Sequence, residues 1–502
     1  MRRINIYKSA IVGMLEELVA IICAFILPKM ILSYFGSDYN GIIASVTQFI
    51  GCIELLKSGI GMATKNALYV PLYNHDNDRI NGIMSATMLF LRRLSYIFVI
   101  GIIIFAFIYP FFIKENFTWI FTFSLVLIIS LGTFFQYYFG LGNQLLLEAD
   151  QKYYIISLIT LINTLFNTII SVSCMKVGMG IHGVKLCSSI VYCSTPIFLH
   201  FYVNKKYNIN RNAKPDWNSI SKRWDAFGMQ MANFVNGNTD IVIATIFLNM
   251  KEVSVYTIYY LVINGIKKIV VRISTGVESA LGNLKAEQNI QKLRDNFLKF
   301  ELILNFICTV LFSCLIILIV PFVKIYTTGI NDVEYSRYIF SIIACLAEMY
   351  FCLRLAYTYM VQAEGAFFET KWYSYIEAII NIVASVILVN KYGLIGIVLG
   401  TLLAMIYRTV VFANYVYKNI IFTNILHFIK RLFITNICVL INSIIGIFII
   451  MKISITNYFT WLEIASLSSI IITIITLLIY LLFDFKSMKG FLTLVFEKIN
   501  KN

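Results

Sequence analysis

The sequence is poor in charged residues. Asp, Glu, Lys and Arg together make up 13% of the 502 residues, about half of their share in a typical soluble domain. Hydrophobic residues reach 59%, which leaves little polar sequence for a water-soluble domain. The composition therefore excludes an ordinary soluble protein and indicates an all-α polytopic membrane protein.

The sequence also lacks the spacing patterns of metal, disulfide and nucleotide sites. The ten cysteines stand singly in apolar stretches, without a Cys-x-x-Cys pair, and the four histidines are scattered. We interpret the cysteines as small packing residues and expect no cofactor. No Gly-x-x-x-x-Gly-Lys-Ser/Thr motif is present, so direct use of ATP is not expected.

Apolar runs near twenty residues, broken by short polar joints, predict about fourteen transmembrane helices. The first run holds Glu16 and Glu17 and lacks a small-residue cleavage site, so we expect it to remain as the first span. The predicted spans are 10–32, 39–63, 90–113, 117–141, 154–175, 181–203, 223–248, 254–280, 297–323, 337–361, 372–389, 393–417, 431–451 and 461–482.

The formal net charge of +15 is concentrated in alternate joints. The joint 204–222 is rich in Lys and Arg, whereas opposite joints hold single cations such as Lys114 and Lys176. Because cytoplasmic loops carry an excess of Lys and Arg, we expect both termini in the cytoplasm and an even number of spans. The charge therefore reports topology, and we expect no nucleic-acid partner.

The chain contains an internal repeat. Pro110-Phe111 matches Pro321-Phe322, and the run 180–183 matches the run 393–396. Six spans followed by six equivalent spans predict two six-helix lobes in a parallel pseudo-two-fold repeat, with a site between them near the membrane midplane. The predicted domains are an N-terminal lobe 1–203, a cytoplasmic linker 204–222, a C-terminal lobe 223–417, and an extra helix pair with a basic tail, 418–502.

The stretch 224–287 concentrates polar groups at membrane depth. Two predicted helices in it each carry polar side chains on one face. Charges at this depth are costly, so they usually line a water-filled cavity or pair across a bundle. The residues are Asn233, Asn236 and Asp240 on the first helix, and Asn264, Lys267, Lys268 and Arg272 on the second.

The segment 146–157, with the sequence LLEADQKYYIIS, resembles a signature of bacterial oligosaccharide flippases. These proteins form the polysaccharide transporter family of the multidrug/oligosaccharidyl-lipid/polysaccharide exporter superfamily. The stretches 34–41 (YFGSDYNG), 47–49 (TQF) and 238–240 (NTD) look like the same family. The resemblance runs from the first span to about the twelfth.

This resemblance implies a two-lobed flippase in the bacterial cytoplasmic (inner) membrane. Its substrate would be an undecaprenyl-diphosphate-linked oligosaccharide, moved to the outer leaflet for surface polysaccharide such as the O-antigen of lipopolysaccharide. Alternating access, driven by a cation gradient, and contact with membrane lipid and polysaccharide polymerase machinery are also expected. Two alternatives stay open: a membrane polysaccharide polymerase or glycosyltransferase, and a multidrug exporter of the same superfamily.

Two groups of candidate site residues follow. Lys and Arg suit a diphosphate through charge-assisted hydrogen bonds, and carboxylates in a cavity can load and release a proton. Each has a simpler interpretation: the cations snorkel or pair with carboxylates such as Glu278 and Glu348, and the other groups hold helices together. The candidates are Lys267, Lys268, Arg272 and Arg354 for the diphosphate, and Glu16, Glu17, Asn233, Asn236, Asp240 and Asn264 for the polar cavity or cation coupling.

Overall fold

The computed structural model describes residues 2–54, 58–113, 117–207, 209–210, 213–221, 239–274, 276–287, 289–452, 455–485 and 488. Regular structure in these residues is helical throughout, so the predicted all-α polytopic class is confirmed. Eleven segments are long and apolar enough to cross a membrane. The number of about fourteen spans stays a prediction, because most of the predicted span 223–248 lies outside the described residues.

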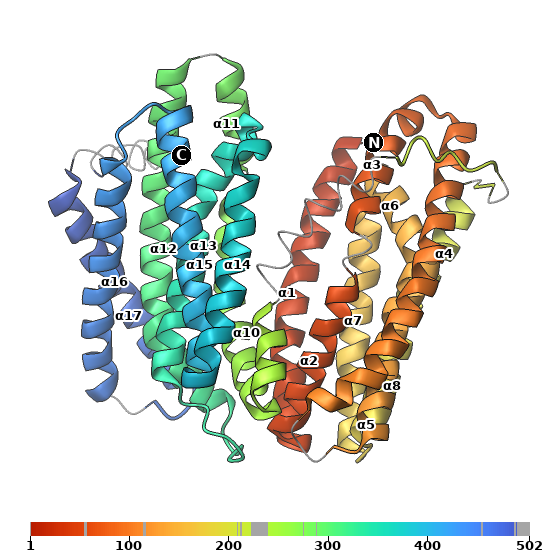
Figure 1. The fold of residues 1–502 in the computed structure, drawn as a ribbon, viewed down its shortest axis with the longest axis horizontal. Helices are drawn as coiled ribbons and strands as arrows, with labels where there is room; N and C mark the ends of the chain where they lie inside the picture. The colour runs from red at the N-terminus through yellow and green to blue at the C-terminus, as the bar shows by residue number, and fades with distance from the viewer. Residues whose placement is uncertain are drawn as a thin grey trace. The chain divides into compact units, whose positions relative to one another are not determined.

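The chain divides into two compact units, Met1–Val255 and Tyr256–Asn502. Figure 1 shows the long helices of the N-terminal unit side by side. Its helices are α1 (Arg2–Phe35), α2 (Ser37–Glu54), α3 (Ser58–Asn74), α4 (Asn77–Ile108), η2 (Tyr109–Phe112), α5 (Trp119–Phe135), η3 (Gln136–Gly140), α6 (Leu141–Ala149), α7 (Tyr153–Lys176) and α8 (Ile181–Lys206). Residues 239–247 and the start of α10 (Met250–Ser274) also belong to this unit.

The C-terminal unit begins within α10. Its remaining helices are α11 (Val277–Ala286), α12 (Ile290–Tyr326), α13 (Tyr338–Glu364), α14 (Phe367–Tyr392), α15 (Leu394–Tyr415), η4 (Val416–Ile420), α16 (Leu426–Lys452) and α17 (Tyr458–Phe483). The predicted extra helix pair corresponds to α16 and α17, and both pack on α12. Asn442 of α16 donates hydrogen bonds to Ser313 at 3.2 Å and to Thr476 of α17 at 3.0 Å, so one buried amide joins the three helices.

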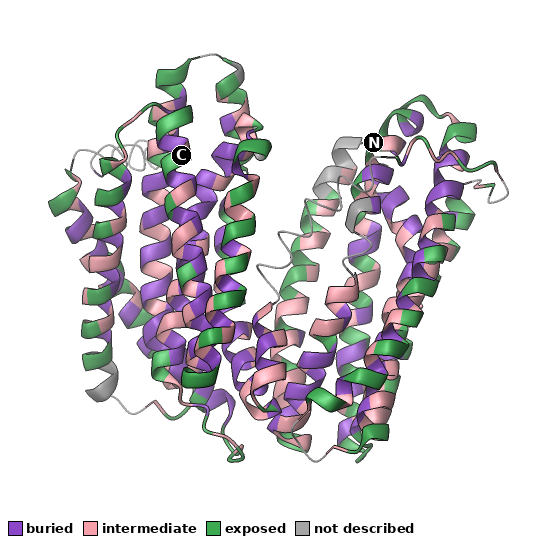
Figure 2. Cartoon of the chain, in the orientation of Figure 1, coloured by how far each residue is buried: buried purple, intermediate pink, exposed green. Residues whose placement is uncertain are grey.

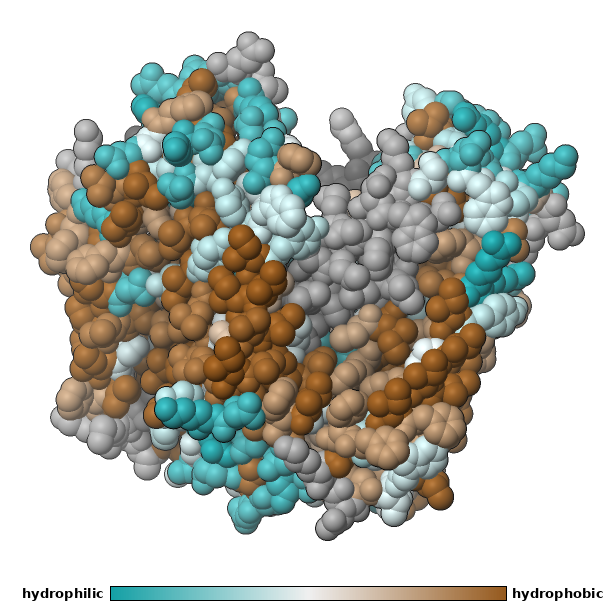
Figure 3. Space-filling view, in the orientation of Figure 1, coloured by the Kyte–Doolittle hydropathy of each residue, from teal (hydrophilic) through white to brown (hydrophobic). Residues whose placement is uncertain are grey.

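The surface of the C-terminal unit fits a lipid environment. In Figure 2 the outward faces of α14 and α16 are largely exposed, whereas α13 is mostly buried. The exposed side chains on α14 and α16 include large apolar ones such as Ile379, Ile387 and Phe433. In Figure 3 the visible face of the C-terminal unit is hydrophobic along its helices and hydrophilic at their ends. This banding is what a bilayer requires of a spanning protein.

The predicted span 39–63 covers most of α2 (Ser37–Glu54) and the start of α3 (Ser58–Asn74). Residues 55–57 between them lie outside the described residues. Helix α3 continues beyond the predicted end of this span at residue 63. The side chain of Asp76 then accepts a hydrogen bond from the Arg79 amide at 3.1 Å and caps α4.

Candidate functional site

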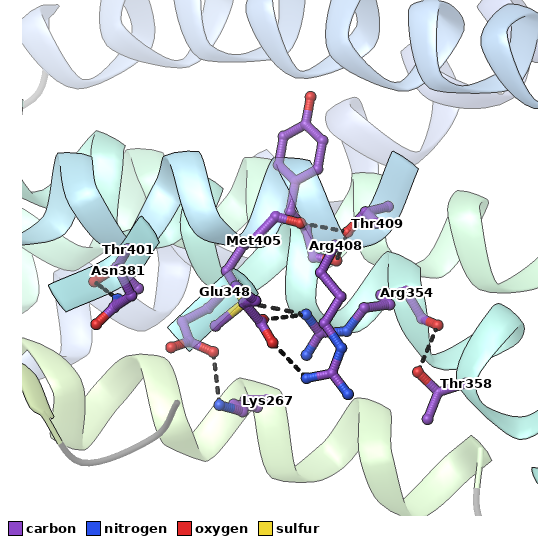
Figure 4. Close-up of polar contacts among 11 residues, drawn as sticks. Lys267, Glu348, Arg354, Thr358, Asn381, Thr401, Met405, Arg408 and Thr409 are labelled. Carbon is purple, nitrogen blue, oxygen red and sulfur yellow. Dashed lines mark hydrogen bonds and ion pairs between the residues drawn. The ribbon is translucent and has the colours of Figure 1, made fainter. Parts of the chain in front are cut away.

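Three charged side chains meet in the interior of the C-terminal unit. Arg354 of α13 and Arg408 of α15 both donate to the carboxylate of Glu377 on α14, at 2.6 and 2.5 Å. Their side chains are only 5, 10 and 1% exposed in the order Arg354, Arg408 and Glu377. Figure 4 shows the two guanidinium groups converging from neighbouring helices. The carboxylate bridges two cations, so the cluster keeps a surplus positive charge.

A second ion pair lies beside this cluster. Lys267 of α10 and Glu348 of α13 are 2.7 Å apart, and the Lys267 side chain is 23% exposed. The ammonium also lies 3.9 Å from the centre of the Phe351 ring, over its face. Arg354 approaches the same ring, with its guanidinium carbon at 5.1 Å. One aromatic ring therefore contacts two cations, which adds cation–π attraction to the ion pairs.

A separate network is centred on Glu301, which is fully buried in α12. Its carboxylate accepts hydrogen bonds from Tyr357 of α13 and from Tyr417 of η4, the latter at 2.8 Å. Arg431 of α16 forms an ion pair with it and also contacts Asp484, just beyond α17, at 3.7 Å. Because every partner comes from a different element, this network fixes the packing of the extra helix pair. We read it as structural.

The flippase-like segment 146–157 forms a tight corner between α6 and α7. Gln151 adopts a positive φ of 59°, and Asp150, Lys152 and Tyr207 form a polar cluster there. Lys152 lies 2.6 Å from Asp150 and donates to the Tyr207 hydroxyl at 2.8 Å. Burial and the hydrogen bond to Asp150 raise the pKa of Tyr207. The phenol therefore stays protonated and ties the end of α8 to this corner.

The N-terminal unit contains a cavity of about 610 Å³ with a mixed apolar and polar wall. It is lined by α1, α2, α5, η3, α7 and α8, and its walls carry amides, hydroxyls and one ammonium, that of Lys185. Asn167 donates to the Tyr192 hydroxyl at 3.3 Å, and Ser171 donates to Asn167 at 3.5 Å. Asn163 pairs with Thr195 and accepts from Ser194. The described lining contains no Asp or Glu.

The structure brings some of the predicted site residues together and separates others. Lys267 and Arg354 lie near each other, both over Phe351. Lys268, Arg272 and Asn264 are exposed on α10. The described residues contain no group of Asp, Glu, His and Cys arranged to hold a metal ion.

The remaining candidates lie in the N-terminal unit. On α1, Glu16 is half-buried and Glu17 is exposed. Asp240 is 8% exposed in the helix 239–247. Asn233 and Asn236 lie outside the described residues.

One expected pairing is wrong. We weighed Glu348 as the partner of Arg354, but Glu348 pairs with Lys267 and the carboxylate beside Arg354 is Glu377. Residues 348 and 354 are six apart on one helix, so their side chains diverge. Glu377 and Arg408 were not singled out, although each interrupts a predicted span. A charged residue inside an apolar run was the signal that would have found both.

Solved structures share the fold of this chain. The chain has the fold seen in solved transporters of the multidrug/oligosaccharidyl-lipid/polysaccharide (MOP) superfamily. An inward-facing MATE family multidrug transporter matches with a TM-score of 0.53 and 15% identity, over 80% of this chain and 94% of that one. A eukaryotic MATE transporter matches with a TM-score of 0.55 and 12% identity, over 83% and 95%.

The lipid II flippase MurJ, in an inward closed conformation, matches over more of the chain. The TM-score is 0.70 at 17% identity, over 94% of this chain and 98% of that one. No protein-family model and no curated protein sequence matches this sequence. The chain is thus a multi-pass membrane protein with a MOP-type fold, and it aligns with nearly the whole length of the lipid II flippase.

Proposed function

We propose that this protein is a flippase that moves undecaprenyl-diphosphate-linked oligosaccharides from the cytoplasmic to the outer leaflet of a bacterial cytoplasmic membrane. The likeness to the lipid II flippase along nearly the whole chain carries this proposal. The flippase-like segment 146–157, which forms the corner between α6 and α7, supports it from the sequence. In this view both termini lie in the cytoplasm, and the product serves a surface polysaccharide such as O-antigen.

The cations of α10 are the proposed contacts of the diphosphate. Lys268 and Arg272 are exposed one turn apart on this helix, and Lys267 is held beside them by Glu348. Ammonium and guanidinium groups bind phosphate oxygens through charge-assisted hydrogen bonds. Arg354 lies deeper and already shares Glu377 with Arg408, so its proposed role is to keep the region electropositive rather than to grip the phosphates.

The proposed cycle is alternating access, reset by a cation gradient. Glu16, Asp240 and Asn264 remain the proposed polar groups for coupling, together with Glu17, Asn233 and Asn236. A carboxylate in a low-dielectric environment can take up and release a proton, and Asp240 is the most buried of the described carboxylates in this set. Asp240→Asn should therefore slow transport more than Glu17→Gln.

A multidrug exporter is the second candidate, favoured by the MATE-like folds. Cationic drugs would be attracted by carboxylates in a cavity. The described lining of the N-terminal cavity instead carries Lys185 and no Asp or Glu. That charge favours anionic cargo, and so the flippase.

The first test is the lipid content of cells that lack this protein. Lipid extracts are analysed by mass spectrometry, and the sidedness of any accumulated lipid is assayed on the same membranes. A complete oligosaccharide-diphosphate lipid on the cytoplasmic face supports the flippase and identifies its sugars. Unchanged lipid-linked sugars would contradict it and favour the drug exporter.

A second test addresses the α10 cations. Lys268→Ala and Arg272→Ala should each reduce transport about tenfold or more, because each removes a charge-assisted contact. Membrane insertion should be unchanged. Lys285→Ala, which removes an exposed cation paired with Glu364 on the α11 side, is the matched control and should transport normally. Normal surface polymer in the triple variant with Lys267→Ala would refute this assignment.

A further inference from the structure

The cavity of the N-terminal unit has an unbalanced charge. Lys185 is the only charged residue in its described lining. It makes no hydrogen bond or ion pair with any residue that the structure describes, in contrast to Lys267, Lys152 and Lys65, which all pair with carboxylates. Lys185 is half-buried, and an ammonium that loses part of its water shell without gaining a partner is disfavoured. Such a group persists most readily where a ligand supplies the missing negative charge.

The rest of the wall is rich in groups that both donate and accept hydrogen bonds. Asn163, Asn167 and Tyr192 face the cavity. The hydrogen bonds that join Asn167 to Tyr192 and to Ser171 are long, at 3.3 and 3.5 Å. A ligand can replace such long bonds with better ones at little cost. The other polar lining residues are Thr47, Thr133, Gln136, Thr160, Ser188, Ser189 and Thr195.

Size and apolar content narrow the ligand further. The volume of about 610 Å³ falls within the range of about 300–1,000 Å³ typical of small-molecule sites, and is far larger than an inorganic anion needs. Leu27, Ile31, Ile50 and Met175 add apolar wall beside the hydroxyls. A sugar ring presents hydroxyls at its edge and apolar C–H groups on its faces, which matches a wall of this mixed kind.

We propose that this cavity is a binding site for an anionic sugar unit, with Lys185 as the contact of its carboxylate or phosphate. The inference deepens the proposed function, on which it rests: the ligand would be an acidic residue of the transported oligosaccharide. Asn163 and Asn167 bind ring hydroxyls, and Tyr192 packs against the ring. A neutral sugar leaves the ammonium unpaired, so the site selects acidic sugars.

The test uses purified full-length protein in lipid nanodiscs. Binding is measured by calorimetry and by the shift in melting temperature, with four probes at equal ionic strength: glucuronate, glucose 1-phosphate, glucose and chloride. Glucuronate or glucose 1-phosphate should bind at least about tenfold more tightly than glucose, because only they form a charge-assisted bond with Lys185. The stronger of the two identifies the anion as carboxylate or phosphate.

Four variants test the site and the role of its ammonium. Lys185→Met should weaken binding of the anionic sugar about tenfold or more, whereas Lys185→Arg should retain most of it. Lys176→Met is the matched control, because Lys176 is an exposed cation at the end of α7 and does not line the cavity. Ser188→Leu fills the cavity without changing charge and should also abolish binding.

The outcomes separate cleanly. Equal binding by wild type and Lys185→Met, equal binding of glucose and glucuronate, or a response reproduced by chloride alone would overturn the site. If the sugars do not bind but cells lacking the protein accumulate lipid-linked sugar, the proposed site is refuted and the flippase proposal stands. If the sugars bind but no such lipid accumulates, the flippase proposal is refuted and the binding site stands.

Discussion

Replacing Glu377 by Gln should destabilise the C-terminal unit strongly. The carboxylate lies between two guanidinium groups, and its side chain is 1% exposed. Gln has nearly the same shape and still accepts a hydrogen bond, but it carries no charge. The variant therefore leaves Arg354 and Arg408 buried beside each other without a counter-charge.

The expected magnitude follows from the geometry. Two opposite charges about 4 Å apart attract by about 4 kcal/mol at an effective dielectric constant of 20, and Glu377 makes two such contacts. Desolvation offsets part of this attraction in the wild type, yet a buried pair broken on one side typically loses about 3–5 kcal/mol. We expect a loss in this range for Glu377→Gln.

The assay is reversible unfolding in mixed micelles with increasing SDS, followed by tryptophan fluorescence. The matched control is Glu287→Gln, which breaks the exposed pair with Lys292 and should cost less than about 1 kcal/mol. The double variant Glu377→Gln/Arg408→Met should recover part of the loss, since it removes one of the unpaired cations. A Glu377→Gln protein as stable as Glu287→Gln would refute the reasoning.

Two further predictions concern packing and pH. An ideal Cβ at Gly396 would lie 2.3 Å from the Leu388 carbonyl oxygen, so Gly396→Ala should lower the free energy of unfolding by about 1–3 kcal/mol. Gly265 has open space around it, so Gly265→Ala should be neutral or stabilising in the same unfolding assay. Hydrogen bonds from Ser219 lower the pKa of Asp216 in the linker. The stability that ionised Asp216 contributes to the fold is complete above the ordinary Asp range near pH ~4. It is lost as the pH falls through the lowered pKa. The difference in melting temperature between wild type and Asp216→Asn should therefore shrink with acidification, and a constant difference from pH 7 to 3 would contradict this.

Much of the helical layout could be predicted because apolar runs are a strong signal. The run 154–175 appears as α7, Tyr153–Lys176, and the run 181–203 as α8, Ile181–Lys206. Ends were less predictable where a helix continues past its apolar part. The run 297–323 gave no sign that α12 begins at Ile290, because the first two turns hold several charged and polar residues and the helix is capped by Asn289.

The charged clusters were less accessible to sequence reasoning. The partner of Arg354 lies on the next helix, and only the packing of α13 on α14 and α15 decides that Glu377 rather than Glu348 faces it. Lys185 was not singled out in the sequence, where it stands near the start of the apolar run 181–203. Its significance depends on the cavity, which five helices of the unit and the short π-helix η3 build together.

The surplus charge of the Arg354–Glu377–Arg408 cluster has an electrical consequence. All three helices that carry it are apolar enough to cross a membrane, so the charge resides within the field that acts across the bilayer. Displacing one elementary charge through the whole of that field changes the energy by about 2.3 kcal/mol per 100 mV. Any motion of these three helices along the membrane normal would carry the charge with it, and the resting potential would then bias the conformation of the protein directly.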